Sequence, residues 1–147
     1  MSEVPVRVGQ SVRFSKTVGE SDVYLFAGIT GDLSPNHVNE QVMAASSYGR
    51  RIAHGALLVG FMSTCSTRMI EAAPPTPDAT AVSLGYDRIR FLAPVFIGDT
   101  LNLSYTIAEI DPERRRSRAK IEVTNQHGTL VAVAEHILKW VPNVPAS

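Results

Sequence analysis

Residues 27–62 read AGITGDLSPNHVNEQVMAASSYGRRIAHGALLVGFM. This stretch ends in an apolar run that starts at Ala56 and carries almost no charge until Arg68. A helix that is apolar on all sides is typically a buried one, so we expect a central helix over residues 54–72, with the rest of the chain packed around it. The proline-rich residues 73–77 should end that helix, because a residue before proline is disfavoured in the helical conformation.

An acid and a histidine precede this helix. Proline is favoured at the first helical position after a capping residue, so Ser34 reads as the cap and Pro35 as the start of a short helix ending near Ala45. His37 then lies in its first turn, while Asp32 lies on the incoming turn. A neutral imidazole beside a carboxylate can accept a proton from a water held between them. The alternative, a turn acid and a surface histidine, stays open on spacing alone.

Gly55 stands at the start of the expected central helix. The first N–H groups of a helix have no partner within it, and a residue without Cβ lets a ligand approach the backbone closely. These donors are suited to hold an oxyanion. The alternative is that Gly55 only allows tight packing.

Length and composition limit the broad class of the protein. The 147 residues suit one domain over residues 1–147, and 44% hydrophobic with 19% charged residues is ordinary for a globular protein. A formal net charge of zero gives no electrostatic case for nucleic acid or an anionic membrane. The N-terminus lacks a signal-peptide core, and the lone Cys65 fits a reducing compartment, so we expect a cytoplasmic protein with no membrane span.

The second half of the chain alternates between apolar and polar residues, the pattern of half-buried strands. Together with an early strand and a short helix over Asp22–Ala27, this predicts an α+β protein whose antiparallel sheet of about five strands curls round the central helix. The expected strands are Ser11–Val18, Val82–Phe91, Thr100–Ile110, Ala119–Thr124 and Thr129–Val141.

Three short segments read GDLSPNH at residues 31–37, YG at 48–49 and IAHG at 52–55. A fourth, RFLAPVFIGDTL at residues 90–101, has a pattern shared by hot dog hydratases and many hot dog thioesterases. Together they resemble the MaoC-like, R-specific enoyl-CoA hydratases of the hot dog fold, over residues 18–140.

The resemblance implies a hydro-lyase that adds water to a trans-2-enoyl thioester, or removes it from a (3R)-hydroxyacyl thioester. The acyl carrier would be CoA or acyl carrier protein, with no metal or other cofactor. Asp32 and His37 match the catalytic pair of the family, and Gly55 matches the position whose N–H polarises the thioester carbonyl. Ser63 matches a position that supports the acid in some members. Family members form homodimers with the acyl tunnel near the interface.

The chain departs from the family at two positions. Ser34 stands where the family usually has asparagine and Asn39 where it often has aspartate, which affects the surroundings of the acid rather than the pair. Arg50 and Arg51 could meet a CoA phosphate, since arginine suits phosphate geometry, or lie in a solvated loop.

Two other functions stay open: an acyl-CoA thioesterase of the same fold, and a non-catalytic acyl-binding subunit. The acid–histidine pair ahead of the central helix favours the hydratase.

Overall fold

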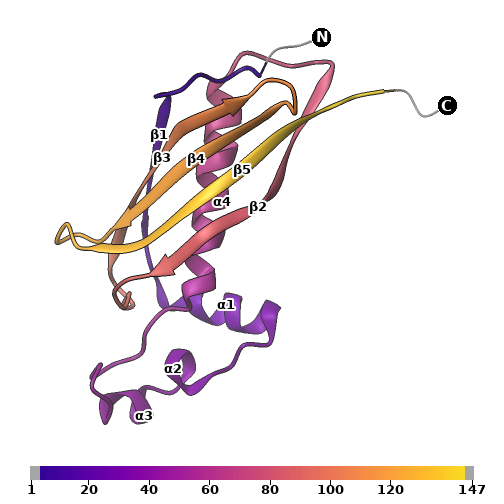
Figure 1. Cartoon of the computed structure of the whole chain (residues 1–147). Helices are drawn as coiled ribbons and strands as arrows, with labels where there is room; N and C mark the ends of the chain where they lie inside the picture. The colour runs from indigo at the N-terminus through magenta and orange to yellow at the C-terminus, as the bar shows by residue number, and fades with distance from the viewer. Residues whose placement is uncertain (1–3, 145–147) are drawn as a thin grey trace.

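The computed structural model describes residues 4–144 and consists of one antiparallel sheet, one long helix and three short helices (Figure 1). The five strands lie in the order β1-β3-β4-β5-β2. They span β1 Ser11–Thr17, β2 Ala79–Phe91, β3 Thr100–Asp111, β4 Arg116–Thr124 and β5 Leu130–Pro142. All four pairings are antiparallel, so the α+β prediction is confirmed.

The sheet order places the first strand after the long helix at an outer edge. β2 pairs with β5 rather than with β3, the next strand in sequence. Its register shifts between Ser83 and Gly85, where Gly85 has a φ of 150°. β1 forms the other edge, beside β3.

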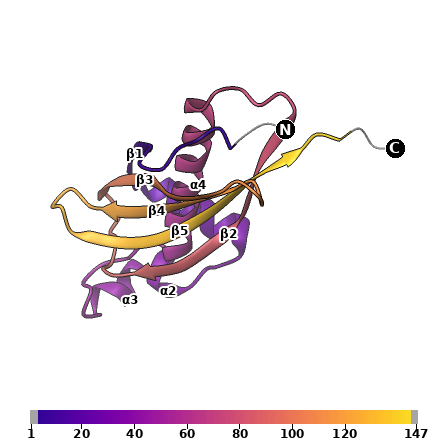
Figure 2. The same ribbon diagram turned by 45° about the horizontal axis from the view of Figure 1, so that its top comes forward.

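The long helix α4, Gly55–Ala72, lies across one face of the curved sheet (Figures 1 and 2). His54 is its N-cap residue rather than its first helical residue. The side of α4 that faces the sheet packs against the inward residues of the strands. The buried core includes Leu58, Met62, Cys65 and Met69 of α4 with Leu101, Leu103, Tyr105 and Ile107 of β3.

The expectation that α4 would be buried on all sides is wrong for this chain. Ala56, Gly60, Ser63 and Thr67, a stripe spaced at helical intervals, are exposed. The five-stranded sheet covers only one side of the helix, so the opposite side faces outward. We call these four residues the outer stripe of α4.

Three short helices gather at the N-terminal end of α4: α1 Glu20–Thr30, α2 Pro35–Val38 and α3 Glu40–Ala44 (Figure 1). The single helix expected over residues 35–45 is broken at Asn39. Its backbone is extended, and its Oδ1 accepts a hydrogen bond of 3.0 Å from the N–H of Val42. A side chain that caps a new helix competes with continuation of the old one, which explains the break. Ser34 does precede α2, although its hydroxyl makes no capping bond.

Arg51 ties this end of the molecule together. Its guanidinium pairs with Glu20 of α1 and Glu40 of α3 and donates to the hydroxyl of Tyr24. Arg50 lies over the ring of Phe96 at 3.9 Å. Arg51 is therefore engaged in structural contacts rather than standing ready for a phosphate.

Within residues 4–144, no helix combines the length and the apolar character needed to cross a membrane.

Candidate active site

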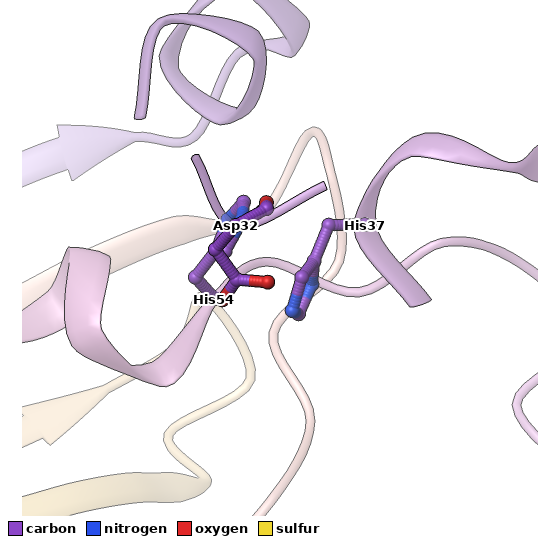
Figure 3. Close-up of side chains that lie close together, drawn as sticks. All are labelled: Asp32, His37 and His54. Carbon is purple, nitrogen blue, oxygen red and sulfur yellow. The ribbon is translucent and has the colours of Figure 1, made fainter. Parts of the chain in front are cut away.

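Asp32, His37 and His54 converge beside the N-terminal end of α4 (Figure 3). The carboxylate and ring-nitrogen atoms that they offer all lie within 4.8 Å of one another. A carboxylate oxygen of Asp32 points toward the ring of His37. The structure therefore brings together the two residues expected from the sequence and adds a histidine for which the sequence suggested no role.

The turn that carries Asp32 is fixed by local contacts. Gly31 closes α1 with a φ of 79°, a conformation that favours glycine. The Asp32 N–H donates to the Thr30 hydroxyl at 3.2 Å, and its Oδ1 accepts from the N–H of Ser34 at 3.3 Å. The side chain of Asp32 remains exposed, so it is available to a ligand.

His37 is held in one tautomer. Its Nδ1 lies 2.7 Å from the carbonyl oxygen of Ile52, and a carbonyl can only accept. The proton of the neutral ring therefore resides on Nδ1, and Nε2 keeps a free lone pair. In return, the N–H of Ile52 donates to the carbonyl of Asn36 at 3.0 Å. His37 can thus take a proton at Nε2 while its ring stays anchored.

His54 is buried, with 2% of its surface exposed. Its ring stacks on His37 with centroids 3.7 Å apart and planes inclined by 27°. Its Nε2 lies 3.0 Å from the backbone carbonyl of Asp32, and Phe26 packs against it at 4.7 Å. The sequence signals for this residue were its place in the IAHG segment at 52–55 and its position directly before Gly55, at the start of the apolar run.

The stacked rings do not suit a metal ion. Two histidines and an aspartate are ligand types that zinc accepts, at about 2.0–2.1 Å from each nitrogen. A metal must lie in the plane of each imidazole that binds it, whereas these planes are nearly parallel and 3.7 Å apart between centroids. One nitrogen of each ring also faces a backbone carbonyl.

A pocket of about 340 Å³ opens next to His37. Gly55 lines it, together with Tyr48, the ring of Phe91 and a largely apolar wall. The remaining lining residues are Ile52, Ala53, Leu58, Leu92, Ala93, Pro94 and Val95. A volume of this size is at the lower end of small-molecule sites.

Gly55 contributes a free donor to this pocket. As the first residue of α4, its N–H has no acceptor within the helix, and it donates no hydrogen bond to any other group of residues 4–144. A Cβ built on Gly55 would lie 2.6 Å from Cε2 of Phe91. A side chain at this position would have to displace the ring, so both readings of Gly55, open donor and close packing, apply together.

Ser63 lies outside this cluster. It belongs to the outer stripe, eight residues beyond Gly55, or about 12 Å along the helix axis. The structure therefore does not bring Ser63 to Asp32 within one chain, and a supporting role for Ser63 stays a prediction.

Two other titratable side chains, those of Cys65 and His136, are buried. Burial raises the pKa of the Cys65 thiol to about 11, so it is a poor nucleophile, as expected. His136 of β5 is fully buried, with Nδ1 at 2.7 Å from the Tyr105 hydroxyl and Nε2 at 2.7 Å from the Ser83 hydroxyl. The sequence suggested no role for His136.

Comparison with known proteins identifies relatives of this chain. The family described as MaoC like domain matches residues 3–131. An (R)-specific enoyl-CoA hydratase of Rhodospirillum rubrum is 40% identical over 111 residues, 75% of this chain and 72% of that protein. A 3-hydroxybutyryl-CoA dehydratase of Methylorubrum extorquens is 40% identical over 114 residues, 77% of this chain and 68% of that one.

The fold is also found among solved structures. An (R)-hydratase from A. caviae involved in PHA biosynthesis superposes with a TM-score of 0.81 at 26% identity, over 91% of this chain and 96% of that one. The hot dog fold implied by the sequence is thereby confirmed.

Proposed function

The chain belongs to the MaoC-like domain family, and from this premise we propose that it is an (R)-specific enoyl-CoA hydratase, a hydro-lyase that adds water reversibly to a trans-2-enoyl thioester. One observation carries the proposal. Asp32 and His37 lie close together beside a pocket, and Nε2 of His37 has a free lone pair. Gly55 lines the same pocket, and its N–H has no hydrogen-bond partner among residues 4–144.

The reaction needs three things: a base for the water, a proton for the α-carbon, and a donor for the developing enolate oxygen. Asp32 and His37 bind one water between them and remove its proton as its oxygen attacks C3. The electrons of the C2–C3 double bond move toward the thioester oxygen, where the Gly55 N–H stabilises the negative charge. A proton from the pair then goes to C2, so that H and OH have been added across the double bond.

The substrate is a thioester of CoA or acyl carrier protein. The apolar wall formed by Leu58, Leu92 and Val95 suits an acyl chain. The thiol of Cys65 is buried away from this chemistry.

A homodimer forms part of the proposal. The outer stripe of α4 presents small residues, Ala56 and Gly60 among them, and β2 is an open edge of the sheet. Open edges and uncovered faces of this kind are commonly closed by a second copy.

The direct test is the loss of enoyl absorbance when purified protein is mixed with crotonyl-CoA. We expect hydration by the wild type, and a fall in kcat of about 10²–10⁴-fold in Asp32→Asn and in His37→Gln, the usual range for loss of an acid–base group. Matched controls are Asp111→Asn, at the end of β3, and His127→Gln, in the turn between β4 and β5, which change the same residue types outside the site. Both should hydrate normally.

Two results would redirect the proposal. Release of free thiol from saturated acyl-CoA, without hydration of crotonyl-CoA, would indicate a thioesterase. Binding of acyl-CoA without turnover of either substrate would indicate a non-catalytic acyl-binding subunit.

A further inference from the structure

The two reacting side chains come from elements that cannot fix each other. Asp32 lies on an exposed turn, and His37 lies in α2, which has only four residues. Helices this short are marginal by themselves. The local contacts of Asp32 and the bond of His37 to Ile52 hold each residue separately, so a group that contacts both can set their geometry relative to each other.

His54 contacts both and is itself well anchored. It caps α4, an 18-residue helix, and is nearly fully buried. The backbone on either side is held: the Ala53 N–H donates to the Val95 carbonyl at 2.7 Å, and the Leu57 N–H donates to the His54 carbonyl at 3.1 Å. The ring of His54 is thus a fixed point of the scaffold.

The hydrogen bonding of His54 defines its chemical state. The Asp32 carbonyl can only accept, so the proton of the neutral His54 ring is on Nε2. Its Nδ1 is buried and finds no hydrogen-bond partner among residues 4–144. An unpartnered buried acceptor costs free energy, which an apolar side chain of similar size would avoid. A histidine at this position therefore indicates that its Nε2 donor is used.

We propose that His54 is a positioning residue for the reaction: its Nε2–H holds the backbone of Asp32 while its ring face fixes the plane of His37. The inference rests on the proposed function for the identity of the reaction, but the geometry it describes is independent of the substrate. His54 touches neither water nor thioester in this scheme. It acts by keeping the carboxylate and the His37 Nε2 turned toward the same volume.

Two substitutions separate the two contacts. His54→Gln keeps an N–H donor but has no ring to stack on His37, whereas His54→Phe keeps a ring but has no donor. We expect each to lower kcat for crotonyl-CoA at least tenfold with KM changed less than about threefold, since misplacement of the pair affects the chemical step rather than binding. Phe26→Leu is the control: it removes the ring that packs on His54 without changing either contact, and should keep kcat within about threefold.

A second readout does not depend on activity. ¹⁵N NMR of the imidazoles should show His37 as the Nδ1–H tautomer in the wild type, in Phe26→Leu and in His54→Phe, which keeps a ring against His37. His54→Gln should show a mixture of tautomers, because without the stacked ring His37 can turn away from the Ile52 carbonyl. If one His54 variant does not fold, as judged by circular dichroism, the other carries the test.

Folded His54 variants with wild-type kcat, or folded His54→Gln with an unchanged His37 tautomer, would overturn the inference. If the wild type fails to hydrate crotonyl-CoA, the proposed function fails, and the NMR experiment alone then decides the role of His54.

Discussion

Protonation of the buried His136 in β5 makes the free energy of unfolding depend on pH, and substitution of this residue alone isolates the effect. His136 is enclosed by the hydroxyls of Ser83 and Tyr105 and by the stacked ring of Tyr86 at 4.5 Å. Burial lowers the pKa of His136 from 6.5 to about 4. The neighbouring groups Tyr86, Tyr105 and Cys65 have pKa values that burial raises, so none of them titrates between pH 4 and 7.

The sign and size of the effect follow from these two pKa values. Below pH 6.5 the unfolded chain binds a proton at this histidine, whereas the folded chain does so only near pH 4. The free energy of unfolding contributed by His136 is therefore complete above pH 6.5 and is lost as the pH falls toward 4. At about 1.4 kcal/mol per tenfold change, the loss is about 1.4 kcal/mol at pH 5.5 and about 2.6 kcal/mol at pH 4.5.

The assay is urea unfolding of the wild type and His136→Gln, followed by Trp140 fluorescence at fixed protein concentration between pH 7.5 and 4.5. Glutamine can bond to both hydroxyls but does not titrate. We expect the variant to be less stable at pH 7.5, because the ring stack is lost, and its deficit to shrink by about 2.6 kcal/mol by pH 4.5. His127 is exposed and lies in a turn, so the free energy of unfolding of His127→Gln should depend on pH as that of the wild type does. If the free energies of unfolding of His136→Gln and wild type differ by the same amount at every pH, His136 does not contribute the predicted pH dependence.

Two further predictions concern the pocket and the outer stripe. Gly55→Ala keeps the backbone N–H, but the added Cβ would lie 2.6 Å from Cε2 of Phe91 and forces that ring to move. We therefore expect kcat/KM to fall about tenfold and to recover in part when Phe91→Ala is added. Full activity of Gly55→Ala would show that the ring does not limit the site. Light scattering of the wild type should give twice the mass of one chain. Gly60→Arg should give the mass of one chain, at a position where an added Cβ meets nothing within 4 Å. A monomeric wild type would exclude the dimer.

The sequence predicted those features that depend on local pattern. The alternation of Leu101, Leu103 and Tyr105 indicates a strand because every second side chain points inward, and all three are buried in β3. Pro35 placed His37 in the first turn of a helix with Asp32 on the incoming turn, and in the structure their carboxylate and ring-nitrogen atoms lie within 4.8 Å of each other. His136 had the same kind of signal: it follows Ala134 and precedes Leu138 on the inward face of β5.

Features that depend on distant contacts were missed. The hydrogen bond from His54 to Asp32 joins residues 22 positions apart. The periodicity of apolar residues along the sequence does not indicate that these two segments lie together. The break at Asn39 depends on a side chain competing with the backbone, and the capture of Arg51 by Glu20 and Glu40 depends on how three segments pack. The pairing of β2 with β5 likewise follows from the closure of the whole sheet.

The proposed mechanism requires that Asp32 and His37 act as one unit on a single water. It is tested most directly by comparing crotonyl-CoA hydration in Asp32→Asn, His37→Gln and the double variant. If the two groups share one step, the double variant should lose no more kcat than the worse single variant. Losses that multiply in the double variant, or wild-type turnover in either single variant, would contradict the account.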